Sequence, residues 1–460
     1  MLNLNSGITI KVIIAALLAA GLLTLSACSK EPEDRPDIVL ITLDTTRWDY
    51  IRSYGYETPN SPNLDKLAAM GSRYLNAITV AGTTFPAHGS MLSGLYPRSH
   101  GARSNFHRLG DNVTTVAEIL SDNGYQTGSF VSFKGMHYIG NLDRGFKTVS
   151  DRTIGKDKEP TRLGSETLDM TLDWLTDTST TEPMFLWMHL FEPHGPYDIT
   201  PWFKSNFADY SGIFQTGVSV SQVRNGRHNN YDQKDIEAMR QIYAGEVHLA
   251  DQYVGELIEQ LKLRGNLDNT LVIITSDHGQ GMGENSQFGH GALLWESVLR
   301  VPLIIVDFRN PSRAVIDQRV GIVDIAPTIL AGANINTTAT MAGRSLYPLD
   351  NPANGEDRLY YAEVALIENP DAKTRRWYNA DDLAVYLGEF KLEFRRDKFK
   401  LFSTTTDKNQ LSRIPKGKAE SLFYYLSDSV SAYLETAGHA QPASLDTQTL
   451  KDLQGLGYTQ

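Results

Sequence analysis

The sequence contains a single cysteine, Cys28, among its 460 residues. One thiol excludes a disulfide bond within the chain. With 41% hydrophobic and 21% charged residues, the composition is that of a globular protein that can bury a large core. The length favours one large domain with a smaller one attached to it.

The sequence also lacks any run of lysine and arginine. Its 43 basic residues are outnumbered by 54 acidic ones, which gives a formal net charge of -11. Such a charge repels a nucleic-acid backbone, so we expect neither DNA nor RNA as a partner. An acidic protein can still bind an anion, but only where metal ions and a few cationic groups reverse the field locally.

No apolar run of membrane-spanning length follows Leu25. Before it, Lys11 precedes the apolar residues 12–25, in which Thr24 is the only polar member. This run is shorter than the roughly 20 residues of a transmembrane helix, and its basic start is typical of a secretory signal. An uncleaved membrane anchor is the alternative. Both interpretations place the protein outside the cytoplasm.

A lipobox-like segment, Leu25-Ser26-Ala27-Cys28, ends the apolar run. In the bacterial lipobox that it resembles, the cysteine is lipidated and becomes the first residue of the mature protein. The resemblance implies a signal peptide over residues 1–27, lipidation at Cys28 and a short tether over residues 28–36. We therefore expect a lipoprotein of the cell envelope, anchored by its lipid to a bacterial membrane and facing the periplasm or the exterior.

Strand-like and helix-like segments alternate between residues 37 and 350. Short apolar runs are typical of buried strands, and they cover residues 38–43, 126–132, 271–275 and 301–306. Helical patterns with capping residues or an apolar stripe cover residues 61–71, 115–124, 234–263 and 324–330. This order predicts an α/β domain over residues 37–350, with a mostly parallel sheet between layers of helices. Ligands bind such sheets at the carboxyl ends of the strands.

The pattern changes after residue 350. Short, partly alternating strands are predicted at residues 359–361, 383–386, 390–394 and 399–402, and a closing helix at residues 447–457. Their hairpin-like spacing predicts a small antiparallel subdomain over residues 351–460. The polar stretch 205–230 is predicted to be an exposed loop beside a substrate cleft.

Acidic residues follow two of the predicted strands. Asp44 comes directly after residues 38–43, and the pair Asp277-His278 follows residues 271–275. Because the carboxyl ends of parallel strands meet at one edge of a sheet, we expect these side chains to converge on one cation. Carboxylate and imidazole ligands suit zinc or manganese better than magnesium. An Asp-His pair at a strand end is, by itself, as often structural as functional.

A hydroxyl residue, Thr84, precedes a helical turn that starts with a proline. The N-terminus of a helix presents unpaired N–H groups and partial positive charge, which favour an oxyanion. A metal-bound hydroxyl there would ionise below its free pKa and act as a nucleophile. His88, one turn further, would face the same way. The residues alone equally allow Thr84 to be an ordinary N-cap and His88 to be a surface residue.

This segment resembles the sulfatase signature, in which Cys or Ser begins a C/S-x-P-x-R motif followed by Leu-(Thr/Ser)-Gly-x-x-Pro. Thr84 stands at the Cys or Ser position and His88 at the Arg position. Other sulfatase-like motifs, in the family's order, are residues 43–47, 189–197, 275–279, 289–291, 296–302, 323–328 and 456–458. The resemblance thus covers nearly the whole chain. It implies an alkaline-phosphatase-like fold and hydrolysis of sulfate, phosphate or phosphonate esters.

Two departures from the sulfatase pattern alter the expected chemistry. Sulfatases convert the Cys or Ser to formylglycine, but Thr84 cannot undergo this conversion, so no formylglycine is expected. Thr45 replaces the second Asp of the family's paired acidic motif. The remaining candidate ligands are similar to the single-metal site of phosphoglycerol and phosphoethanolamine transferases, which use a threonine nucleophile. These ligands are Asp44, Thr84, Asp277 and His278. One divalent ion is expected, with zinc or manganese favoured and calcium, as in sulfatases, the alternative.

Three histidines are candidate catalytic residues beside Thr84. In the predicted mechanism the metal acidifies the Thr84 hydroxyl, which attacks in line and forms a threonyl ester. The candidates for donors to the nonbridging oxygens or the leaving group are His88, His194 and His290. Each also has a structural alternative. His189 is a candidate partner of a metal ligand, and Lys134 is a weaker candidate for a substrate-binding cation.

Three functions are compatible with these residues. The first is a hydrolase of small anionic esters or of sulfated or phosphorylated glycans or lipids. The second is an envelope transferase, ranked lower because such transferases usually carry several membrane spans. The third is a binding lipoprotein without catalysis, against which the intact candidate site argues. A threonyl sulfate, unlike formylglycine sulfate, must be displaced again, so phosphate or phosphonate esters are favoured over sulfate.

Overall fold

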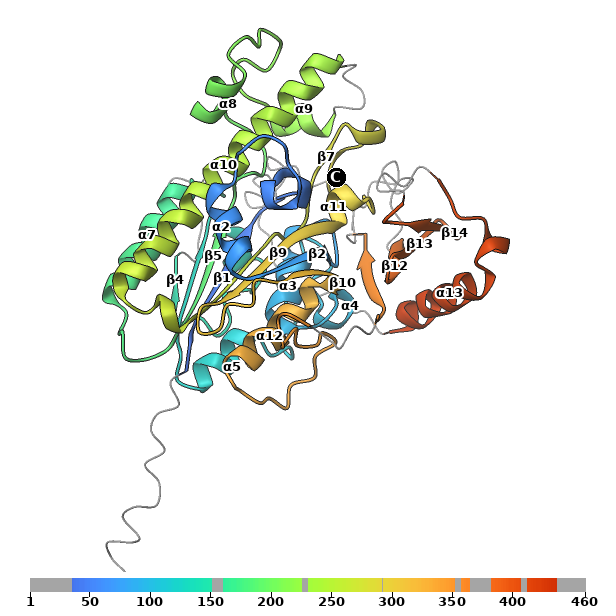
Figure 1. Cartoon of the computed structure of the whole chain (residues 1–460). Helices are drawn as coiled ribbons and strands as arrows, with labels where there is room; N and C mark the ends of the chain where they lie inside the picture. Colours follow the sequence, from blue (N-terminus) through green and yellow to red (C-terminus); the bar gives the residue numbers. More distant parts are fainter. Residues whose placement is uncertain are drawn as a thin grey trace, which may run out of the picture. The chain divides into compact units, whose positions relative to one another are not determined.

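The central element of the structure, a computed structural model, is a sheet of eight strands (Figure 1). The structure describes residues 35–150, 160–225, 231–291, 293–351, 357–364, 382–406 and 412–436. The predicted signal peptide, Cys28, most of the tether and the predicted helix 447–457 lie outside the described residues. The boundary between the two domains near residue 350 stays a prediction.

The spatial order of the sheet is β10 (Val315–Gly321), β2 (Ser72–Ile78), β9 (Arg300–Asp307), β6 (Thr270–Thr275), β1 (Asp37–Leu43), β5 (Met184–Leu190), β3 (Gln126–Val131) and β4 (Thr148–Val149). The pairs among β6, β1, β5, β3 and β4 are parallel, and so is the pair of β10 with β2. The predicted mostly parallel sheet is thus confirmed.

Strand β9 runs antiparallel to both of its neighbours, β6 and β2. The sequence predicted the strand but not its direction. Between β6 and β9 the chain forms β7 (Gly281–Met282), β8 (Phe288–Gly289) and α11 (Glu296–Leu299). The start of this connection pairs with its end, because Gly279 N–H donates to Val298 O at 2.7 Å. The chain therefore enters β9 at the edge of the sheet where β6 ends, so β9 runs in the opposite direction to β6.

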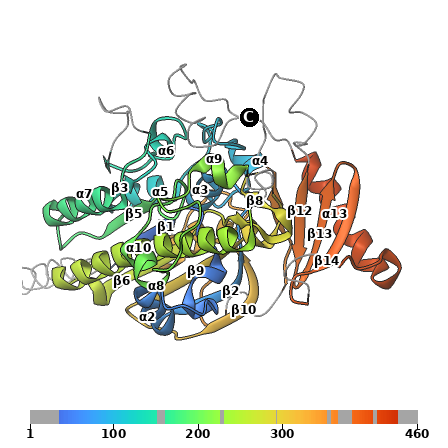
Figure 2. The same ribbon diagram turned by 90° about the horizontal axis from the view of Figure 1, so that it is seen from above.

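Side chains of β1 enter two separate hydrophobic cores on the two faces of the sheet. Ile38 and Leu40 pack in one core, whereas Val39 and Ile41 pack in the other, as the alternation of side chains along a strand requires. The first core is lined by α3 (Thr84–Ser93), α5 (Val116–Asp122) and α12 (Ile325–Gly332), the second by α2 (Pro62–Met70), α7 (Gly164–Asp177) and α10 (Gln233–Arg264). Figure 2 labels α3 and α5 of the first layer and α2, α7 and α10 of the second.

Helix ends follow the capping signals of the sequence. Thr115 and Glu118 form the predicted reciprocal capping box at the start of α5. Asp232 accepts a hydrogen bond from Asp235 N–H at the start of α10, and Gly265 ends that helix with a φ of 87° that favours glycine. The shorter helices are α4 (Pro97–His100), α6 (Gly135–Tyr138), α8 (Pro201–Asn206) and α9 (Val220–Arg224).

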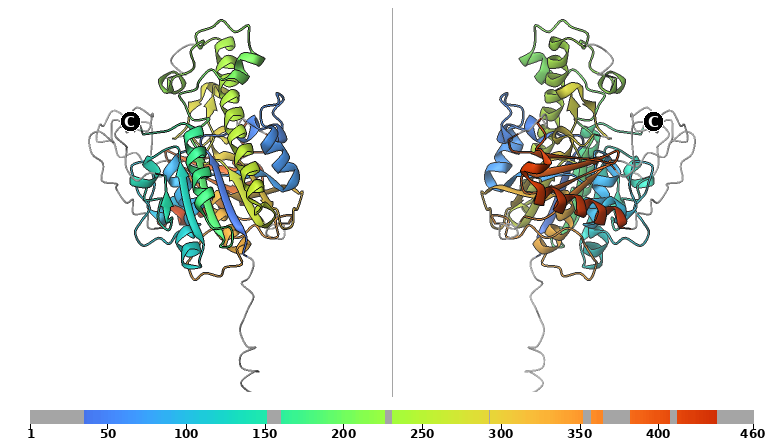
Figure 3. Two further views of the ribbon diagram at one scale, coloured as in Figure 1. Left: turned by 90° about the vertical axis from the view of Figure 1, so that its left-hand side faces the viewer. Right: turned by 90° about the vertical axis from the view of Figure 1, so that its right-hand side faces the viewer.

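A second, antiparallel sheet confirms the four short strands predicted for the C-terminal region. It contains β11 (Tyr360–Glu363), β12 (Leu383–Leu387), β13 (Phe390–Arg395) and β14 (Lys398–Ser403) in chain order, shown in orange and red in Figure 3. Helix α13 (Glu420–Glu435), which contacts β12 and β13, was not predicted. Its buried residues Leu426, Val430 and Tyr433 recur at steps of four and three, so the helical period was present in the sequence.

The prediction of an exposed loop over residues 205–230 is wrong in part. Residues 220–224 form α9, which Ser219 caps through its side chain, and Phe214 and Val218 are buried in the second core. The isolated apolar residues of this stretch indicated its buried positions, but its polar average composition favoured an exposed loop. Among the described helices, none combines the length and the apolar character that crossing a membrane requires.

A buried carboxyl group joins α10 to the loop that follows β5. Glu246 on α10 is 5% exposed and accepts a hydrogen bond from Asp198 N–H at 2.7 Å. Burial raises the pKa of Glu246 from 4.5 to about 8, although this hydrogen bond opposes the shift. The folded protein therefore binds a proton at Glu246 more tightly than the unfolded chain does. Stability must fall as the pH rises from about 4.5 to about 8.

Replacing Glu246 by Gln is expected to remove this loss of stability, because Gln keeps the acceptor oxygen and cannot ionise. Near pH 4 the variant and the wild type should unfold alike, whereas above pH 8 the variant should be more stable. The gain is on the order of 5 kcal/mol, because the pKa rises from 4.5 to about 8 and one pKa unit corresponds to about 1.4 kcal/mol. Urea unfolding across this pH range measures it. Glu256→Gln, at an exposed position of the same helix, is the matched control, and a pH-independent difference at Glu246 would contradict the assignment.

Candidate metal and catalytic site

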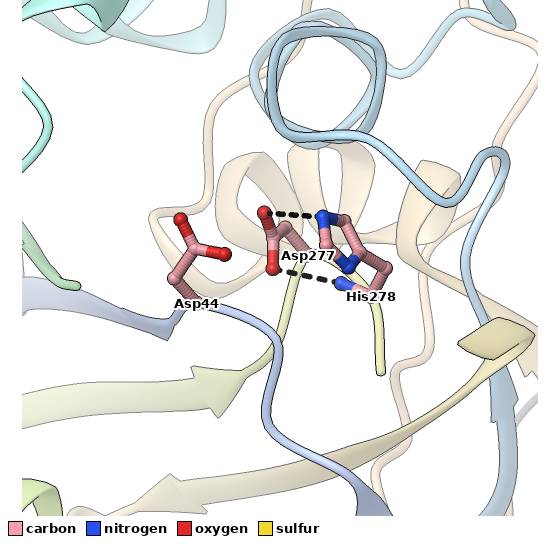
Figure 4. Close-up of side chains that lie close together, drawn as sticks. All are labelled: Asp44, Asp277 and His278. Carbon is pink, nitrogen blue, oxygen red and sulfur yellow. Dashed lines mark hydrogen bonds and ion pairs between the residues drawn. The ribbon is translucent and has the colours of Figure 1, made fainter. Parts of the chain in front are cut away.

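Asp44 and Asp277 lie close together at the carboxyl edge of the sheet (Figure 4). In the pairing of β1 with β6, Thr42 stands opposite Thr275. The residues two positions further on each strand, Asp44 and Asp277, therefore leave the sheet together. His278 follows, and one ligand atom from each of the three side chains lies within 4.8 Å of the others. All three side chains are fully buried.

The loop after β1 is fixed from two sides. Thr45 N–H donates to Asp277 Oδ1 at 3.0 Å. From α10, the Tyr243 hydroxyl donates to Thr45 O at 2.7 Å and accepts from Arg47 N–H at 2.9 Å. Thr45 has a φ of 53°, in the left-handed region that few non-glycine residues adopt. These contacts hold the strained loop, and they fix the orientation of Asp44 at its start.

Several buried polar atoms of the site have no hydrogen-bond partner within the described residues. They are both carboxylate oxygens of Asp44, Oδ2 of Asp277, Nε2 of His278 and Oγ1 of Thr45. Burial raises the pKa of Asp44 well above its usual value, and the neighbouring Asp277 raises it further. Unpaired buried polar atoms and adjacent carboxylates both cost free energy. A divalent cation would offset both costs, and this set of oxygen and nitrogen ligands fits one.

Thr84 is the first residue of α3 and is fully buried, with Thr83 as the N-cap. The interpretation of Thr84 as an ordinary N-cap is therefore wrong. Phe85 N–H donates to Asn105 Oδ1 at 2.8 Å. The next residue is a proline, and Ala87 N–H donates to Thr83 O at 3.3 Å. The expectation of unpaired N–H groups after Thr84 is thus wrong as well. The N–H of Phe85 donates to a side chain, and the N–H of Ala87 donates to the carbonyl oxygen of the N-cap.

His88 is fully buried, so its interpretation as a surface residue is wrong. Its Nδ1 donates to Thr84 O at 2.9 Å, and its Nε2 is 3.1 Å from Thr42 Oγ1. A carbonyl oxygen only accepts, so the ring proton is on Nδ1 and the Thr42 hydroxyl donates to Nε2. Burial also lowers the pKa of His88 and keeps the ring neutral. His88 therefore connects the start of α3 to the end of β1.

Three further histidines share one tautomer. The Nδ1 atoms of His194, His278 and His290 each donate to a backbone carbonyl, at 2.7, 3.0 and 3.1 Å respectively. The lone pair is therefore on Nε2 in each ring. His290 stacks on His278 with 4.4 Å between ring centroids and lies 5.3 Å from His194. Burial lowers the pKa of His194 and of His278 to about 3. In this state Nε2 accepts a proton or binds a metal, and it donates only after it has been protonated.

Two further buried residues lie beside the site, His189, which was predicted as a partner of a metal ligand, and Asn105, which was not predicted. His189 on β5 has Nε2 at 3.4 Å from Asp44 Oδ2, and neither ring nitrogen has a hydrogen-bond partner within the described residues. Asn105, which holds Phe85, has an Nδ2 that is likewise unpaired in the described part of the chain. Asn105 was not predictable from the sequence, because no motif marks a lone asparagine. Lys134 is buried at the start of α6.

Comparison with known proteins identifies the family. The sequence matches the family described as Sulfatase over residues 36–335, and the chain belongs to this family. It is 25% identical to arylsulfatase K of Rattus norvegicus over 395 residues, which cover 75% of this chain and 69% of that protein. It is 24% identical to the uncharacterized sulfatase YidJ of Escherichia coli, covering 69% and 72% of the two chains. The protein is thus a sulfatase-family ester hydrolase.

Solved structures show the same fold. One is described as BT4656 in complex with its substrate D-glucosamine-2-N,6-O-disulfate; it has a TM-score of 0.71 at 18% identity and covers 90% of this chain and 100% of its own. Another is the phosphonate monoester hydrolase of Agrobacterium radiobacter, with a TM-score of 0.69 at 18% identity and coverage of 87% and 95%. These matches confirm the predicted alkaline-phosphatase-like fold.

The site predicts that divalent metal stabilises the folded protein through Asp277. After chelation, Zn²⁺ or Mn²⁺ at one hundred times its dissociation constant should raise the free energy of unfolding by about 2.7 kcal/mol. Asp277→Asn keeps Oδ1 as the acceptor for Thr45 N–H but removes the charge, so it should abolish most of this metal effect. Without metal, the same variant should be no less stable than wild type, because the repulsion with Asp44 is relieved.

Thermal unfolding with and without metal, together with metal analysis of the purified protein, measures both effects. Asp268→Asn, at an exposed position in the 3-10 turn before β6, is the control and should keep the full metal response. If Asp277→Asn retained the wild-type response, the ion would have to bind elsewhere.

Proposed function

We propose that the protein is a metal-dependent hydrolase that cleaves phosphonate, phosphate or sulfate esters through a covalent intermediate on Thr84. The observation that carries this proposal is the buried group of Asp44, Asp277 and His278, whose ligand atoms lack hydrogen-bond partners within the described residues. Thr84 is the first residue of α3, and His88 connects this helix to Thr42 on β1. Thr42 is two residues before Asp44. The four proposed ligands are therefore tied to one edge of the sheet.

A divalent ion held by Asp44, Thr84, Asp277 and His278 would lower the pKa of the Thr84 hydroxyl and withdraw charge from the ester. The protein's own residues perform the remaining steps. Thr45 N–H and His278 N–H both donate to Asp277 Oδ1, at 3.0 and 2.8 Å, which leaves Oδ2 for the ion. His88 orients the first turn of α3 from inside the protein, so it acts as a positioning residue.

In the proposed reaction, Thr84 Oγ1 attacks the phosphorus or sulfur atom. The bond from Oγ1 to that atom forms as the bond to the leaving oxygen breaks. The hydroxyl proton passes to Nε2 of His290 or His194 and from there to the leaving oxygen. Both Nε2 atoms carry a lone pair in the tautomer that follows from the Nδ1 contacts with carbonyl oxygens. Water then attacks the threonyl ester and passes one proton to the same Nε2. That proton moves on to Thr84 Oγ1 as the bond from Oγ1 to phosphorus or sulfur breaks.

The nucleophile favours esters of phosphorus over esters of sulfur. A hydrated formylglycine can release sulfate by elimination, but Thr84 has no second hydroxyl, so a threonyl ester must be displaced at the central atom. The structural likeness to a phosphonate monoester hydrolase supports this choice. The likeness to proteins solved with glucosamine disulfate and with a carrageenan oligosaccharide supports a glycan carrier for the ester group.

Thr84→Ala should lower kcat/KM by at least about 10³-fold, or about 4 kcal/mol, because it removes the attacking oxygen. Thr84→Ser keeps a hydroxyl and should stay within about tenfold of wild type. Activity is measured on the 4-nitrophenyl sulfate, phosphate and phenylphosphonate esters with added Zn²⁺ or Mn²⁺. Wild-type protein quenched during turnover should carry the transferred group on the peptide that contains Thr84.

Thr83→Ala is the matched control, because the Thr83 side chain makes no capping hydrogen bond; its activity should change less than about threefold. Full activity in Thr84→Ala would remove the nucleophile from the mechanism. Turnover that requires an added acceptor alcohol would identify a transferase instead.

We also propose that the enzyme is a lipoprotein of the bacterial envelope, anchored through Cys28. The apolar segment and the lipobox-like residues before Cys28 support this location. In a bacterial host, Cys28→Ser should abolish incorporation of radiolabelled palmitate and release the protein from the membrane fraction. Ser29→Ala, one residue further, should leave both unchanged. Labelling that persists in Cys28→Ser would contradict a lipid anchor at this position.

A further inference from the structure

The antiparallel C-terminal sheet reaches the candidate site through a buried lysine. Lys391 on β13 is fully buried. Its Nζ donates to Leu294 O and lies 3.3 Å from Glu296 Oε1 and 3.3 Å from Glu393 Oε1. The Tyr386 hydroxyl on β12 donates to the same Glu296 oxygen at 2.8 Å. Two strands of the second sheet thus bind the chain segment that leads into β9.

The segment that Lys391 binds is the one that carries His290. His290 is four residues before Leu294, and its Nδ1 donates to Gly82 O at 3.1 Å. Gly291 N–H donates to the same carbonyl at 2.8 Å. Gly82 is two residues before Thr84. Lys391 therefore fixes Leu294 through its carbonyl oxygen. Four residues earlier in the chain, the ring of His290 stacks on His278, the proposed metal ligand.

The first strand of the same sheet binds the residues just before Gly82, whose carbonyl oxygen accepts the hydrogen bond from His290. Glu363 on β11 donates its N–H to Val80 O at 2.8 Å, next to a bridge between Ala81 and Glu363. Its buried carboxylate pairs with Arg98 and Arg103, each at 3.2 Å. One sheet thus holds both the residues just before Gly82 and the residues just after His290.

A buried ion pair is weak support for stability, because the desolvation of the charges offsets their attraction. An apolar side chain at position 391 would pack at lower cost, but it could not hold the Leu294 carbonyl. Lys391 and Arg319 lower the pKa of Glu296 against the effect of burial, so the carboxylate is charged and its geometry with Lys391 is directional. The arrangement favours a role in fixing one conformation of the segment.

We propose that Lys391 is a positioning residue, which sets the place of His290 over the candidate site by binding Leu294 O and Glu296. This inference rests on the proposed function, in the form in which His290 rather than His194 carries the proton between Thr84 and the leaving oxygen. Because that task acts on the reaction step more than on binding, loss of Lys391 reduces kcat while KM changes little.

A double-mutant cycle between Lys391 and His290 tests the inference. With 4-nitrophenyl phenylphosphonate or 4-nitrophenyl sulfate and saturating metal, Lys391→Met should lower kcat at least about tenfold and change KM less than about threefold. In the His290→Ala background, Lys391→Met should change kcat less than about twofold, because the group that it positions is gone. Metal content should stay at the wild-type level in every variant.

Lys398→Met, on the exposed surface of β14, is the matched control and should leave both constants unchanged. If Lys391→Met does not fold, Lys391→Met with Glu296→Gln removes the opposed charges together and should show the same loss of kcat, because the contact with Leu294 O is still absent. Losses that multiply independently in the double variant would show a purely structural role and overturn the inference, as would wild-type kcat in Lys391→Met.

The two failures are distinguishable. Full activity in His290→Ala would refute the proposed role of His290 and, with it, the positioning by Lys391. Impaired Thr84→Ala and His290→Ala variants combined with a fully active Lys391→Met variant would leave the proposed mechanism in place and refute the positioning inference alone.

Discussion

The repulsion between two buried carboxylates governs the arrangement of this protein's site. Asp44 and Asp277 leave neighbouring parallel strands at the same level, and the closed packing around them admits no solvent to either. Such a pair is unfavourable by itself, because burial and proximity both oppose ionisation. The strained loop at Thr45, the hydroxyl of Tyr243 and the first turn of α3 all hold the surroundings in place against this cost. A divalent cation between the two carboxylates would offset this cost.

The ends of strands were the part of the site that the sequence could predict. Asp44 and Asp277 each follow a short apolar run, and parallel pairing in register brings such positions together whatever the loops do. The three histidines were found by their motifs, but their tautomers depend on backbone carbonyls that only the folded loops supply. Asn105 was missed because its partner, Phe85 N–H, becomes available only where α3 begins. Long-range polar contacts of this kind leave no period in a sequence.

The fold followed a similar division. Apolar runs located β1 and β6, the helical period located α10, and partial alternation located the four strands of the second sheet, since these signals arise within each element. The direction of β9 was not predictable from its own residues, because an apolar run does not indicate whether a strand pairs parallel or antiparallel. It is set by the pairing of Gly279 with Val298, which returns the chain to the edge it had just left. Helix α13 was not predicted, although the helical period of its buried residues is present in the sequence.

The return of the chain at this edge has a consequence for changes in loop length. The connection from β6 to β9 lies wholly outside the hydrogen-bond ladder of the main sheet, yet it contributes His278 at one end and His290 near its middle. Between these two positions the connection pairs only with itself, through β7 and β8, so a residue gained or lost in the turn between them leaves the pairing of the main sheet unchanged. A change in the length of this turn would therefore alter the surroundings of His278 and His290 while the main sheet keeps its register.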